Sequence, residues 1–526
     1  MDLMNIIQNL NVEEALKQTD LKSSAGIAAA VLLTAFAVRR ALSKRDNIPT
    51  VPYTFPFIGS TIAYVKDPSK FGQEATEKYG NVFRVNLFGQ MVTVVGADNA
   101  HEVFTHPDMS FLASQRKFLD FGLMLDFSDY RLPPNALTAA ILKHLTPNLN
   151  LYSPRGFNQY LQIADTLFGN ATEPVVLPNL LPYIQSLIGR SSAAAFVGLD
   201  LCKDEDLMHT FEKVVAEVGA EIRPGLFRAI FPWFNNLYMR AVYPRLTAFK
   251  RHRGNIRKAI EPEIRKRVER MKENPDSNTP EDMLQYMIQT FPVEISNAYF
   301  ETLTTWLVTM IFVGVHTTSE ATTHVVYQLL AHPEYIEELL EEQEEALREE
   351  AAVRGIVYNP AKVSDNGLFT SDVYKKLVKL DSFIRETFRV RSRGFHHAHT
   401  YVGKKDIVLQ SGAIIHPGEE VYINLWHVHN DEKTQKAANE DIYNFHPYRY
   451  VGLGKHATKI GDDFLTFGLG RHACPGRWFA IQQVKGIVSF LIRHYNFAAE
   501  GPVRRPDVGN NLRNPEGKVR IEKKKQ

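Results

Sequence analysis

The sequence is poor in cysteine, with two among its 526 residues, Cys202 and Cys474. Two cysteines exclude the disulfide framework of a small secreted protein, and they favour a reducing compartment. Charge of one sign is also lacking, because 61 basic residues face 59 acidic ones and the formal net charge is +2. This balance gives no reason to expect a nucleic-acid partner. Internal repeats, low-complexity tracts and interior linkers are absent as well, which predicts a single large domain despite the length.

Long uncharged apolar runs are scarce, and the one that stands out lies near the N-terminus at residues 23–38. A spanning helix needs about 20 apolar residues, and Leu21 with a snorkelling Lys22 extends this one. Four basic residues follow within 39–45, so the positive-inside tendency places the N-terminus in the lumen and the rest in the cytosol. A cleaved signal peptide would carry a basic leading region, which is missing. We predict a membrane anchor at about 21–38, spanning the bilayer or lying in it, with a soluble buried helix as the alternative.

Proline gathers directly after this segment. Residues 47–59 carry three prolines within eight positions, and such a run favours an extended, semi-rigid connection. The sequence therefore divides into an N-terminal segment with the anchor at 1–45, a hinge at 46–60 and a main domain at 61–526.

Strands are few, and most of the main domain has a helical pattern. Strand character appears at 83–89 and 91–96, around a Gly-Gln turn, and again at 407–415 and 420–425. The proline-free, apolar stretch between Pro292 and Pro333 predicts one long buried helix. The expected fold class is mainly α with small β-sheets.

Cys474 lies in a glycine-rich run, in which Phe467, Gly470 and Gly476 complete the spacing F-x-x-G-x-x-x-C-x-G. A cysteine that binds iron must be a thiolate, and a thiolate needs donors and dipoles around it. The glycines allow the backbone to approach a flat ligand closely. The apolar stretch at 478–492 predicts a buried helix after the cysteine, whose free N–H groups and positive dipole end favour a thiolate. The alternative is a structural cysteine in a glycine-rich turn.

The long predicted helix contains Gly314, His316 and Thr317 near its middle. A glycine inside a helix costs about 1 kcal/mol relative to alanine, so Gly314 needs a reason, such as close approach of a flat group. Thr317 can bond back to a carbonyl one turn earlier and loosen the helix locally, which makes a groove for oxygen and a water. His316 has an ordinary pKa near neutrality and can join a proton relay, with a satisfied core histidine as an equal alternative.

Further along, Glu386 and Arg389 place opposite charges three positions apart on one face of a predicted helix, and Arg449 follows in the run F-H-P-Y-R-Y. In order and spacing these segments resemble the cytochrome P450 family: oxygen groove, E-x-x-R pair, meander, cysteine loop. The resemblance covers nearly the whole chain. It implies the cytochrome P450 fold, as a single large catalytic domain behind the anchor, and a buried ionic network of the three charged residues.

The resemblance also implies the chemistry. Haem b would be held by Cys474 as the axial iron ligand, a ligation that favours O–O cleavage, with Phe467 shielding the thiolate. Thr317, with a water and His316, would deliver protons. The residues at these motifs resemble those of microsomal fungal members, which implies a monooxygenase at the endoplasmic reticulum membrane. Its electrons would come from NADPH through cytochrome P450 reductase, with cytochrome b5 as a further candidate donor. The expected enzyme is a monomer acting on a lipophilic substrate, for which we suggest a steroid or terpenoid.

Other activities stay open at this point. Sterol demethylation rests mainly on His316, because a histidine at this place also occurs in sterol demethylases. A reductase-independent haem-thiolate isomerase, dehydratase or peroxygenase has less need of Thr317, and a haem sensor or carrier has little use for a proton relay and an anchor.

The sequence departs from the family pattern where the haem propionates are expected. His472 stands in place of the usual arginine, with Arg471 beside it, and the common W-x-x-x-R motif is absent from 135–146. Candidate propionate ligands are therefore His472, Arg471, Lys143, His144 and His399.

Two further sets of residues are assigned by position. Basic residues expected near the cysteine face, as a docking surface for the reductase or as ordinary surface charge, are Arg471, Arg477 and Lys485. Residues expected in the substrate pocket, with core packing as the alternative, are Phe111, Phe118, Phe121, Met124, Phe127, Trp306, Met310 and Val313.

Overall fold

The computed structural model describes most of the main domain. The described residues are 47–53, 58–118, 131–133, 135–169, 173–222, 232–242, 245–274, 281–291, 294–360, 367–392, 394–435, 441–504 and 514–524. The predicted anchor helix and its basic cluster lie outside these ranges. So do Phe121, Met124 and Phe127 of the predicted aromatic cluster, and the side chain of Phe118.

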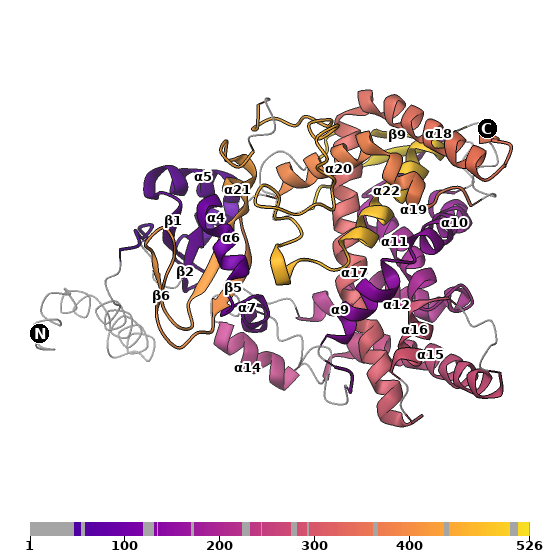
Figure 1. Cartoon of the computed structure of the whole chain (residues 1–526), viewed down its shortest axis with the longest axis horizontal. Coiled ribbons are helices and arrows are strands. Elements are labelled where there is room, and N and C mark those ends of the chain that lie inside the picture. Colours follow the sequence, from indigo (N-terminus) through magenta and orange to yellow (C-terminus); the bar gives the residue numbers. More distant parts are fainter. Residues whose placement is uncertain are drawn as a thin grey trace, which may run out of the picture.

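Helices dominate the described chain and fill the larger part of the molecule (Figure 1). The α-helices are α4 (Thr61–Lys66), α5 (Pro68–Tyr79), α6 (Ala97–Thr105), α7 (Phe111–Phe118), α9 (Ala136–Ala140), α10 (Leu149–Phe168), α11 (Leu181–Phe196), α12 (Glu205–Ile222), α14 (Pro232–Val242), α15 (Thr247–Glu273), α16 (Met283–Thr290), α17 (Asn297–Ala331), α18 (Ile336–Val353), α19 (Ser371–Lys376), α20 (Val378–Arg391), α21 (Leu425–Asn430) and α22 (Arg477–His494). Short turns of other helix types are η2 (Ile141–Leu145), η3 (Leu201–Lys203), η5 (Pro333–Tyr335) and η7 (Gly470–His472). The predicted fold class, mainly α with small sheets, is confirmed.

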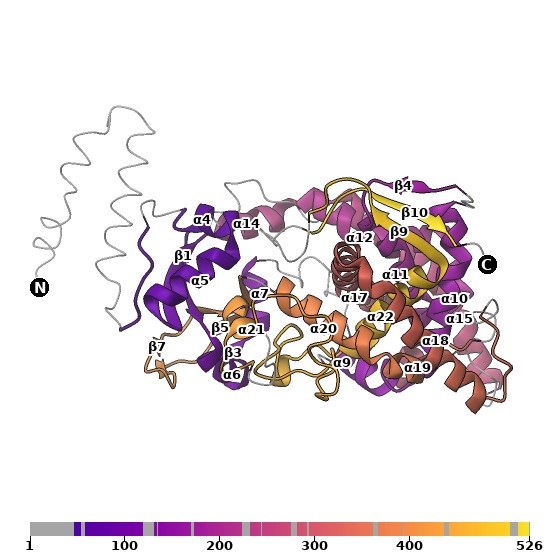
Figure 2. The ribbon, with the colours of Figure 1, turned by 90° about the horizontal axis from the view of Figure 1, so that it is seen from above.

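The largest sheet has five strands in the order β1-β2-β8-β5-β3 and lies beside α4, α5 and α6 at one end of the molecule (Figures 1 and 2). A second sheet has the order β4-β10-β9, and β6 pairs with β7 alone. The strands are β1 (Val82–Leu87), β2 (Gln90–Val95), β3 (Met109–Ser110), β4 (Val175–Leu177), β5 (Phe395–Tyr401), β6 (Ile407–Val408), β7 (Ile414–Ile415), β8 (Glu420–Asn424), β9 (Tyr495–Ala499) and β10 (Val519–Lys523).

The strand predictions hold for β1, β2 and β8, with one shift and one correction. The turn between β1 and β2 is formed by Phe88 and Gly89, at φ 51° and 72°, one residue earlier than predicted. Two positive φ values match the twist of a two-residue hairpin. The single strand predicted at 407–415 is wrong, because the chain turns back at Gly412 (φ 81°) and pairs β6 with β7.

The long helix predicted between two prolines is α17, which runs through the helical part (Figure 1). It begins after Ser296, whose hydroxyl accepts a hydrogen bond from the Tyr299 N–H at 3.2 Å, as an N-cap should. Helices α11, α12, α15, α20 and α22 pack around it. Within the described ranges α17 is the helix long and apolar enough to span a membrane, but 72% of that apolar window is buried in protein, as in a core helix.

Candidate active site

The loop that carries Cys474 folds back on itself before α22 begins. The Cys474 N–H donates to the Phe467 carbonyl at 2.8 Å, and Gly470 adopts φ 57°. Gly468, which the sequence pattern did not single out, has φ 71°, and a Cβ there would lie 2.9 Å from the His472 carbonyl oxygen. Helix α22 starts right after Gly476, as predicted, so Cys474 stands just before a helix N-terminus.

The surroundings of Cys474 favour a thiolate more than those of Cys202. Burial raises the pKa of the Cys474 thiol, whereas the backbone N–H groups of Gly476 and Arg477 and the Arg477 charge act to lower it. Cys202 is buried, donates its thiol to the Gly198 carbonyl at 3.3 Å, and has a pKa raised by burial to about 12. Of the two cysteines, Cys474 is therefore the one built to bind a metal through sulfur.

Arg477 is committed to the loop. Its guanidinium donates to the Cys474 carbonyl at 2.8 Å and to the Thr458 carbonyl at 3.1 Å, and it stacks 3.5 Å over the Trp478 ring. It therefore fixes the cysteine backbone, a contribution that the sequence analysis missed when it assigned Arg477 to a docking surface.

Along one face of α17, the side chains change from buried in the protein to exposed. Trp306, Met310, Val313 and Thr317 follow each other at spacings of four, three and four residues, which is one helix face. Protein packing covers Trp306 and Met310, at 0% and 2% exposed, but leaves Val313 45% exposed and Thr317 exposed. The packing thus makes Trp306 and Met310 core residues, and the open face starts at Val313. The Thr317 hydroxyl bonds back to the Val313 carbonyl at 2.7 Å, as predicted.

His316 has a partner that the sequence analysis did not name. Its Nε2 lies 3.3 Å from Glu320 Oε1, one helical turn on, and the same oxygen accepts from Asn514 Nδ2 at 2.9 Å. Burial alone would raise the pKa of Glu320, but the hydrogen bonds with His316 and Asn514 and the charge of Arg391 hold it below its usual range. The other nitrogen of His316, Nδ1, is buried without a hydrogen-bond partner among the described residues.

A phenylalanine ties the two halves of the site together. A Cβ on Gly314 would contact the Phe196 ring at 3.7 Å, and the same ring lies 5.9 Å, between centroids, from Phe479 of α22. Phe479 is five residues after Cys474. The middle of α17 and the start of α22 therefore pack on one shared side chain.

The predicted ionic network exists and is closed to solvent. Arg389 binds Glu386 with two hydrogen bonds, at 2.7 and 2.8 Å, and Arg449 Nε donates to the same carboxylate at 3.1 Å. Backbone carbonyls accept further guanidinium hydrogen bonds, including Ile442 O from Arg389 and Asp441 O from Arg449, each at 2.7 Å. The three side chains are at most 1% exposed. The network holds the meander between Glu386 and the cysteine loop against α20.

Two more buried cations support the same region, and one corrects a prediction. Arg385, 1% exposed in its side chain, donates to the His456 and Lys459 carbonyls and pairs with Asp463 at 3.2 Å. Lys485 is 5% exposed and pairs with Asp381 at 2.7 Å. The prediction that Lys485 belongs to a reductase docking surface is therefore wrong, because its ammonium is enclosed.

The candidate propionate ligands differ in whether their side-chain nitrogens already make hydrogen bonds within the protein. His144 has both ring nitrogens engaged, by Asn148 at 3.3 Å and by Tyr152 OH at 2.8 Å, and it stacks on Tyr286. These contacts leave it no nitrogen for a propionate, so that prediction fails. Lys143 on the same turn is exposed.

His399 and His472 stand close together, with ring centroids 5.1 Å apart. His472 Nε2 lies 3.1 Å from Arg471 Nε, a donor, and 3.2 Å from the Met109 carbonyl oxygen, an acceptor. His399 donates Nδ1–H to the His397 carbonyl at 2.6 Å, and its Nε2 is buried with no partner in the described part of the chain. Burial lowers the His399 pKa to about 4, so a carboxylate at Nε2 would bind the ring together with a proton.

Arg471 itself is exposed, and one of its guanidinium nitrogens, Nη2, donates to the carbonyls of His106, Pro107 and Met109. Phe111 packs 5.9 Å from the His399 ring. Phe111, His399 and His472 therefore meet at one place between α7, β5 and the cysteine loop.

These structural features of the chain fit an iron porphyrin. The thiol stands before a helix N-terminus, an apolar and hydroxyl-bearing face of α17 lies open, and a buried histidine nitrogen lacks a partner among the described residues. A model of one family matches residues 211–522, more than half of the chain, and that family is cytochrome P450. The chain belongs to the cytochrome P450 family. Its resemblance to fungal members is likewise confirmed by the relatives.

The relatives are fungal monooxygenases. Cytochrome P450 monooxygenase 71 of Postia placenta is 27% identical over 91% of this chain and 92% of its own length. Cytochrome P450 monooxygenase sirB of Leptosphaeria maculans is 26% identical over 86% of both chains. Cytochrome P450 monooxygenase paxP of Penicillium paxilli is 25% identical over 86% of this chain and 85% of its own. This P450 is thus a haem-thiolate monooxygenase, and its family implies a redox partner and a lipophilic substrate.

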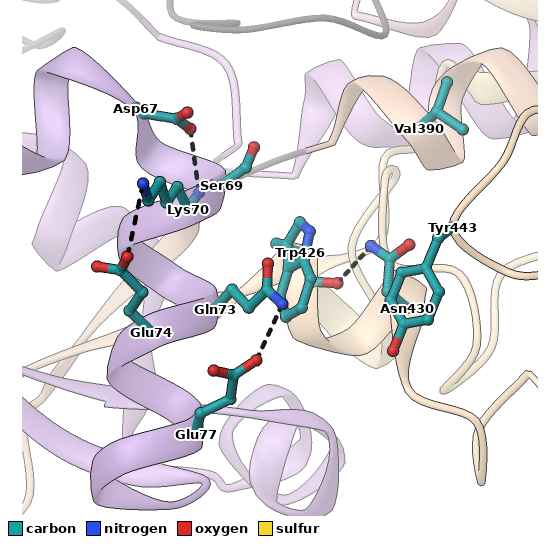
Figure 3. Close-up of a pocket in the computed structure, with 10 residues that line it drawn as sticks. All are labelled: Asp67, Ser69, Lys70, Gln73, Glu74, Glu77, Val390, Trp426, Asn430 and Tyr443. Carbon is teal, nitrogen blue, oxygen red and sulfur yellow. Dashed lines mark hydrogen bonds and ion pairs between the residues drawn. The ribbon is translucent and has the colours of Figure 1, made fainter.

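A cavity of about 540 Å³ between α5 and α21 is a separate feature (Figure 3). Several of its polar groups already pair with each other: Asp67 accepts from the Lys70 N–H at 3.0 Å, Lys70 lies 3.8 Å from Glu74, and Asn430 donates to the Trp426 carbonyl at 2.8 Å. Ser69 Oγ is buried without a hydrogen-bond partner among the described residues. None of its lining residues belongs to α17 or to the cysteine loop. We therefore assign it no part in the chemistry.

Proposed function

We propose that this P450 inserts one oxygen atom from O2 into a steroid or terpenoid, with electrons from NADPH delivered by cytochrome P450 reductase. The observation that carries the proposal is the position of Cys474 before α22, where the N–H groups of Gly476 and Arg477 act on its sulfur. Haem b, held through that sulfur, supplies the activation of the O–O bond when bound. Phe467, next to the cysteine loop, shields the thiolate.

The chain's own residues then have three tasks. Thr317 and His316 hold and pass protons on the open face of α17, with Glu320 fixing the orientation of the His316 ring. His399, His472 and Arg471 hold the propionates, with Lys143 as a further candidate. Val313 and Phe111, with Phe118, Phe121 and Met124 from the aromatic cluster, give the substrate an apolar wall. An apolar wall beside a hydroxyl suits a lipophilic molecule that is oxidised at an unactivated carbon.

The test of thiolate ligation is the carbon monoxide difference spectrum of the dithionite-reduced, haem-loaded protein. The wild type should give a strongly red-shifted Soret band that Cys474→Ala abolishes. Cys202→Ala is the matched control, because Cys202 is the other cysteine and only bonds a carbonyl. An imidazole-type band that survives Cys474→Ala would move the ligand to a histidine and end the proposal.

The substrate and the electron source need separate tests. Steroids and terpenoids are screened for substrate-induced spin shifts, and product formation is then measured with NADPH and reductase, with and without cytochrome b5. Turnover with peroxide alone would favour a peroxygenase, and turnover without electrons would favour an isomerase. Loss of a methyl group from a sterol would favour a demethylase.

We also propose that residues 21–38 anchor a monomeric enzyme in the endoplasmic reticulum membrane, with the catalytic domain in the cytosol. Support comes from the apolar run and the basic residues after it. Carbonate extraction of microsomes tests membrane integration, and protease protection tests orientation. Release by carbonate would show a segment that lies on the bilayer and does not span it.

A further inference from the structure

Away from Cys474, three metal-ligating side chains converge where α12 packs against α15 (Figure 1). His209 and Glu217 come from α12, and His252 comes from α15. His209 Nε2 lies 3.2 Å from Glu217 Oε1, and His252 Nε2 lies 3.1 Å from Glu217 Oε2. All the ligand atoms lie within 4.8 Å of one another. None of the three belongs to the oxygen-activating machinery described above.

The buried ring of His252 is held at both nitrogens. Its Nδ1 lies 3.1 Å from the Thr210 hydroxyl, which also lies 3.1 Å from the Asp206 carbonyl and can donate its single hydrogen to either. Its Nε2 faces Glu217 Oε2. When Thr210 donates to Asp206, Nδ1 carries the proton and a lone pair of Nε2 points to the carboxylate.

A lone pair facing a carboxylate oxygen requires a cation between them, either a proton or a metal ion. Zinc bonds to histidine nitrogen and carboxylate oxygen at about 2.0–2.2 Å, so neighbouring ligands of a tetrahedral ion lie roughly 3.3 Å apart. The observed nitrogen–oxygen separations of 3.1 and 3.2 Å are close to that ligand-to-ligand distance. The hydrogen bond from the far nitrogen of His252 to Thr210 is the outer contact that ligating histidines usually make.

We propose that His209, Glu217 and His252 form a binding site for a divalent transition-metal ion, with Zn²⁺ as the probe. Two imidazoles and one carboxylate suit Zn²⁺ and its neighbours in the first transition row, and they leave a coordination position for water. The site is accessible, because the side chain of His209 is 47% exposed, whereas that of His252 is 0% exposed and held in place.

Arg251 is the competitor of the metal. Its guanidinium pairs with the same oxygen of Glu217 that faces His252, and its side chain is 53% exposed. An exposed arginine can swing into solvent when the ion arrives, so the site exchanges one cation for another.

The metal ion would cross-link helices α12 and α15. Helices α12 and α15 already share one apolar core, and polar contacts also join them, such as Thr247 Oγ1 to Glu221 Oε1 at 2.7 Å and Lys258 to Asp206 at 3.3 Å. Helix α12 also packs against α17, which carries Thr317. An ion that binds the folded chain and not the unfolded one raises the unfolding temperature, and the rise grows with the logarithm of its free concentration above Kd.

The test is titration calorimetry of tag-free, haem-loaded full chain with Zn²⁺ after dialysis against a chelator. Wild type should bind one Zn²⁺ per chain, and His209→Ala should weaken the affinity by more than about tenfold. His101→Ala is the matched control, because His101 is an exposed histidine, 60% exposed, in a similar pair with Asp462 at 2.8 Å. Equal affinity in wild type and His209→Ala would overturn the site.

Two further variants sharpen the result without touching the buried ligand. Arg251→Ala removes the competing cation and should raise the Zn²⁺ affinity, and a lower affinity would contradict the exchange. Thr210→Val keeps the side-chain shape and should weaken binding by about 10–100-fold, since it removes the outer hydrogen bond. The carbon monoxide difference band, unchanged in each variant, confirms that the protein is folded around its haem.

Discussion

The two sides of the Cys474 site treat buried polar groups in opposite ways. Behind the cysteine loop, the Glu386 carboxylate accepts three hydrogen bonds from Arg389 and Arg449 and one from the His446 N–H at 3.0 Å. On the facing side, His316 Nδ1 and His399 Nε2 are buried without partners among the described residues. The Glu386 carboxylate is fully paired, although Arg385 Nε and His429 Nδ1 near it lack partners among the described residues, whereas the two histidine nitrogens of the second side have capacity left for ligands.

The difference separates residues that support the cysteine loop from residues that take part in binding and chemistry. A fully satisfied network in a low-dielectric interior is rigid and specifies one arrangement, which is what a thiolate ligand needs from its support. An unsatisfied buried polar group in a native structure needs an explanation, and a ligand or an ordered water is the usual one. Changes to the first side should therefore cost folding, and changes to the second should cost chemistry.

The largest effect should come from Glu386→Ala. It leaves two arginines buried without their carboxylate, and breaking such a pair costs roughly 3–5 kcal/mol. We expect little folded, haem-loaded protein, measured as the urea midpoint and the yield of the carbon monoxide band. Glu261→Ala is the control, because Glu261 pairs with exposed Arg265 at 2.8 Å on α15 and should cost under about 1 kcal/mol. A Glu386→Ala protein as stable as this control would show that the network is not structural.

Thr317→Ala should leave the fold intact and uncouple electron use from product. Positioned proton transfer contributes about 10²–10⁴-fold, so the fraction of NADPH that ends in product should fall by at least about tenfold. Thr309→Ala is the matched control, since Thr309 makes the same bond back to a carbonyl, at 2.7 Å, two turns earlier. Coupling at the wild-type level in Thr317→Ala would remove Thr317 from the proton path.

The region behind the cysteine loop should also be sensitive to acid. Burial lowers the pKa of His429 to about 3, and its Nε2 accepts from the Leu465 N–H at 3.1 Å. The unfolded chain binds this proton below about pH 6.5, so His429 contributes stability above that pH and loses it as the pH falls toward 3, by roughly 1.4 kcal/mol per unit. Urea midpoints at pH 7 and 5 should diverge less in His429→Phe than in wild type. An unchanged divergence would mean that other groups carry the acid sensitivity.

The smallest effect is expected from Glu320→Gln on the reacting side. The folded pKa of Glu320 is lowered, so its charge contributes stability above the unfolded pKa near 4.3, and that contribution is lost as the pH falls through the folded value. The variant should lose under about 1 kcal/mol at pH 7 and have a flatter acid limb. Coupling efficiency measured beside it should fall if Glu320 orients His316, and should stay constant if the pair is only structural.

The sequence predicted the parts of the site that depend on short spacing. Cys474 with its glycines, the Glu386–Arg389 pair and Thr317 all follow from local patterns, and the long helix follows from its flanking prolines and apolar content. Contacts between distant segments were not predictable in this way. Asn514 meets Glu320 across 194 positions, and Lys485, which was expected at the surface, pairs with Asp381.

The sequence also did not predict which side chains are exposed, because exposure depends on tertiary packing. Trp306 and Val313 look equivalent on one helix face, and only the packing around α17 covers the first and leaves the second open. His144 looked like a ligand by position, but Tyr152 and Asn148 take its nitrogens.

The strands that follow α22 bear on the order in which the site is built. Helix α22 runs directly into β9, and β9 is held by β10, whose last residue is Lys523. Asn514, the partner of Glu320, lies in the same terminal stretch. Domains form as the chain leaves the ribosome from its N-terminus, so Cys474 emerges before the strand that fixes its helix. A chain cut between α22 and β10 therefore keeps its iron ligand but loses the strand that holds β9 and the partner of Glu320.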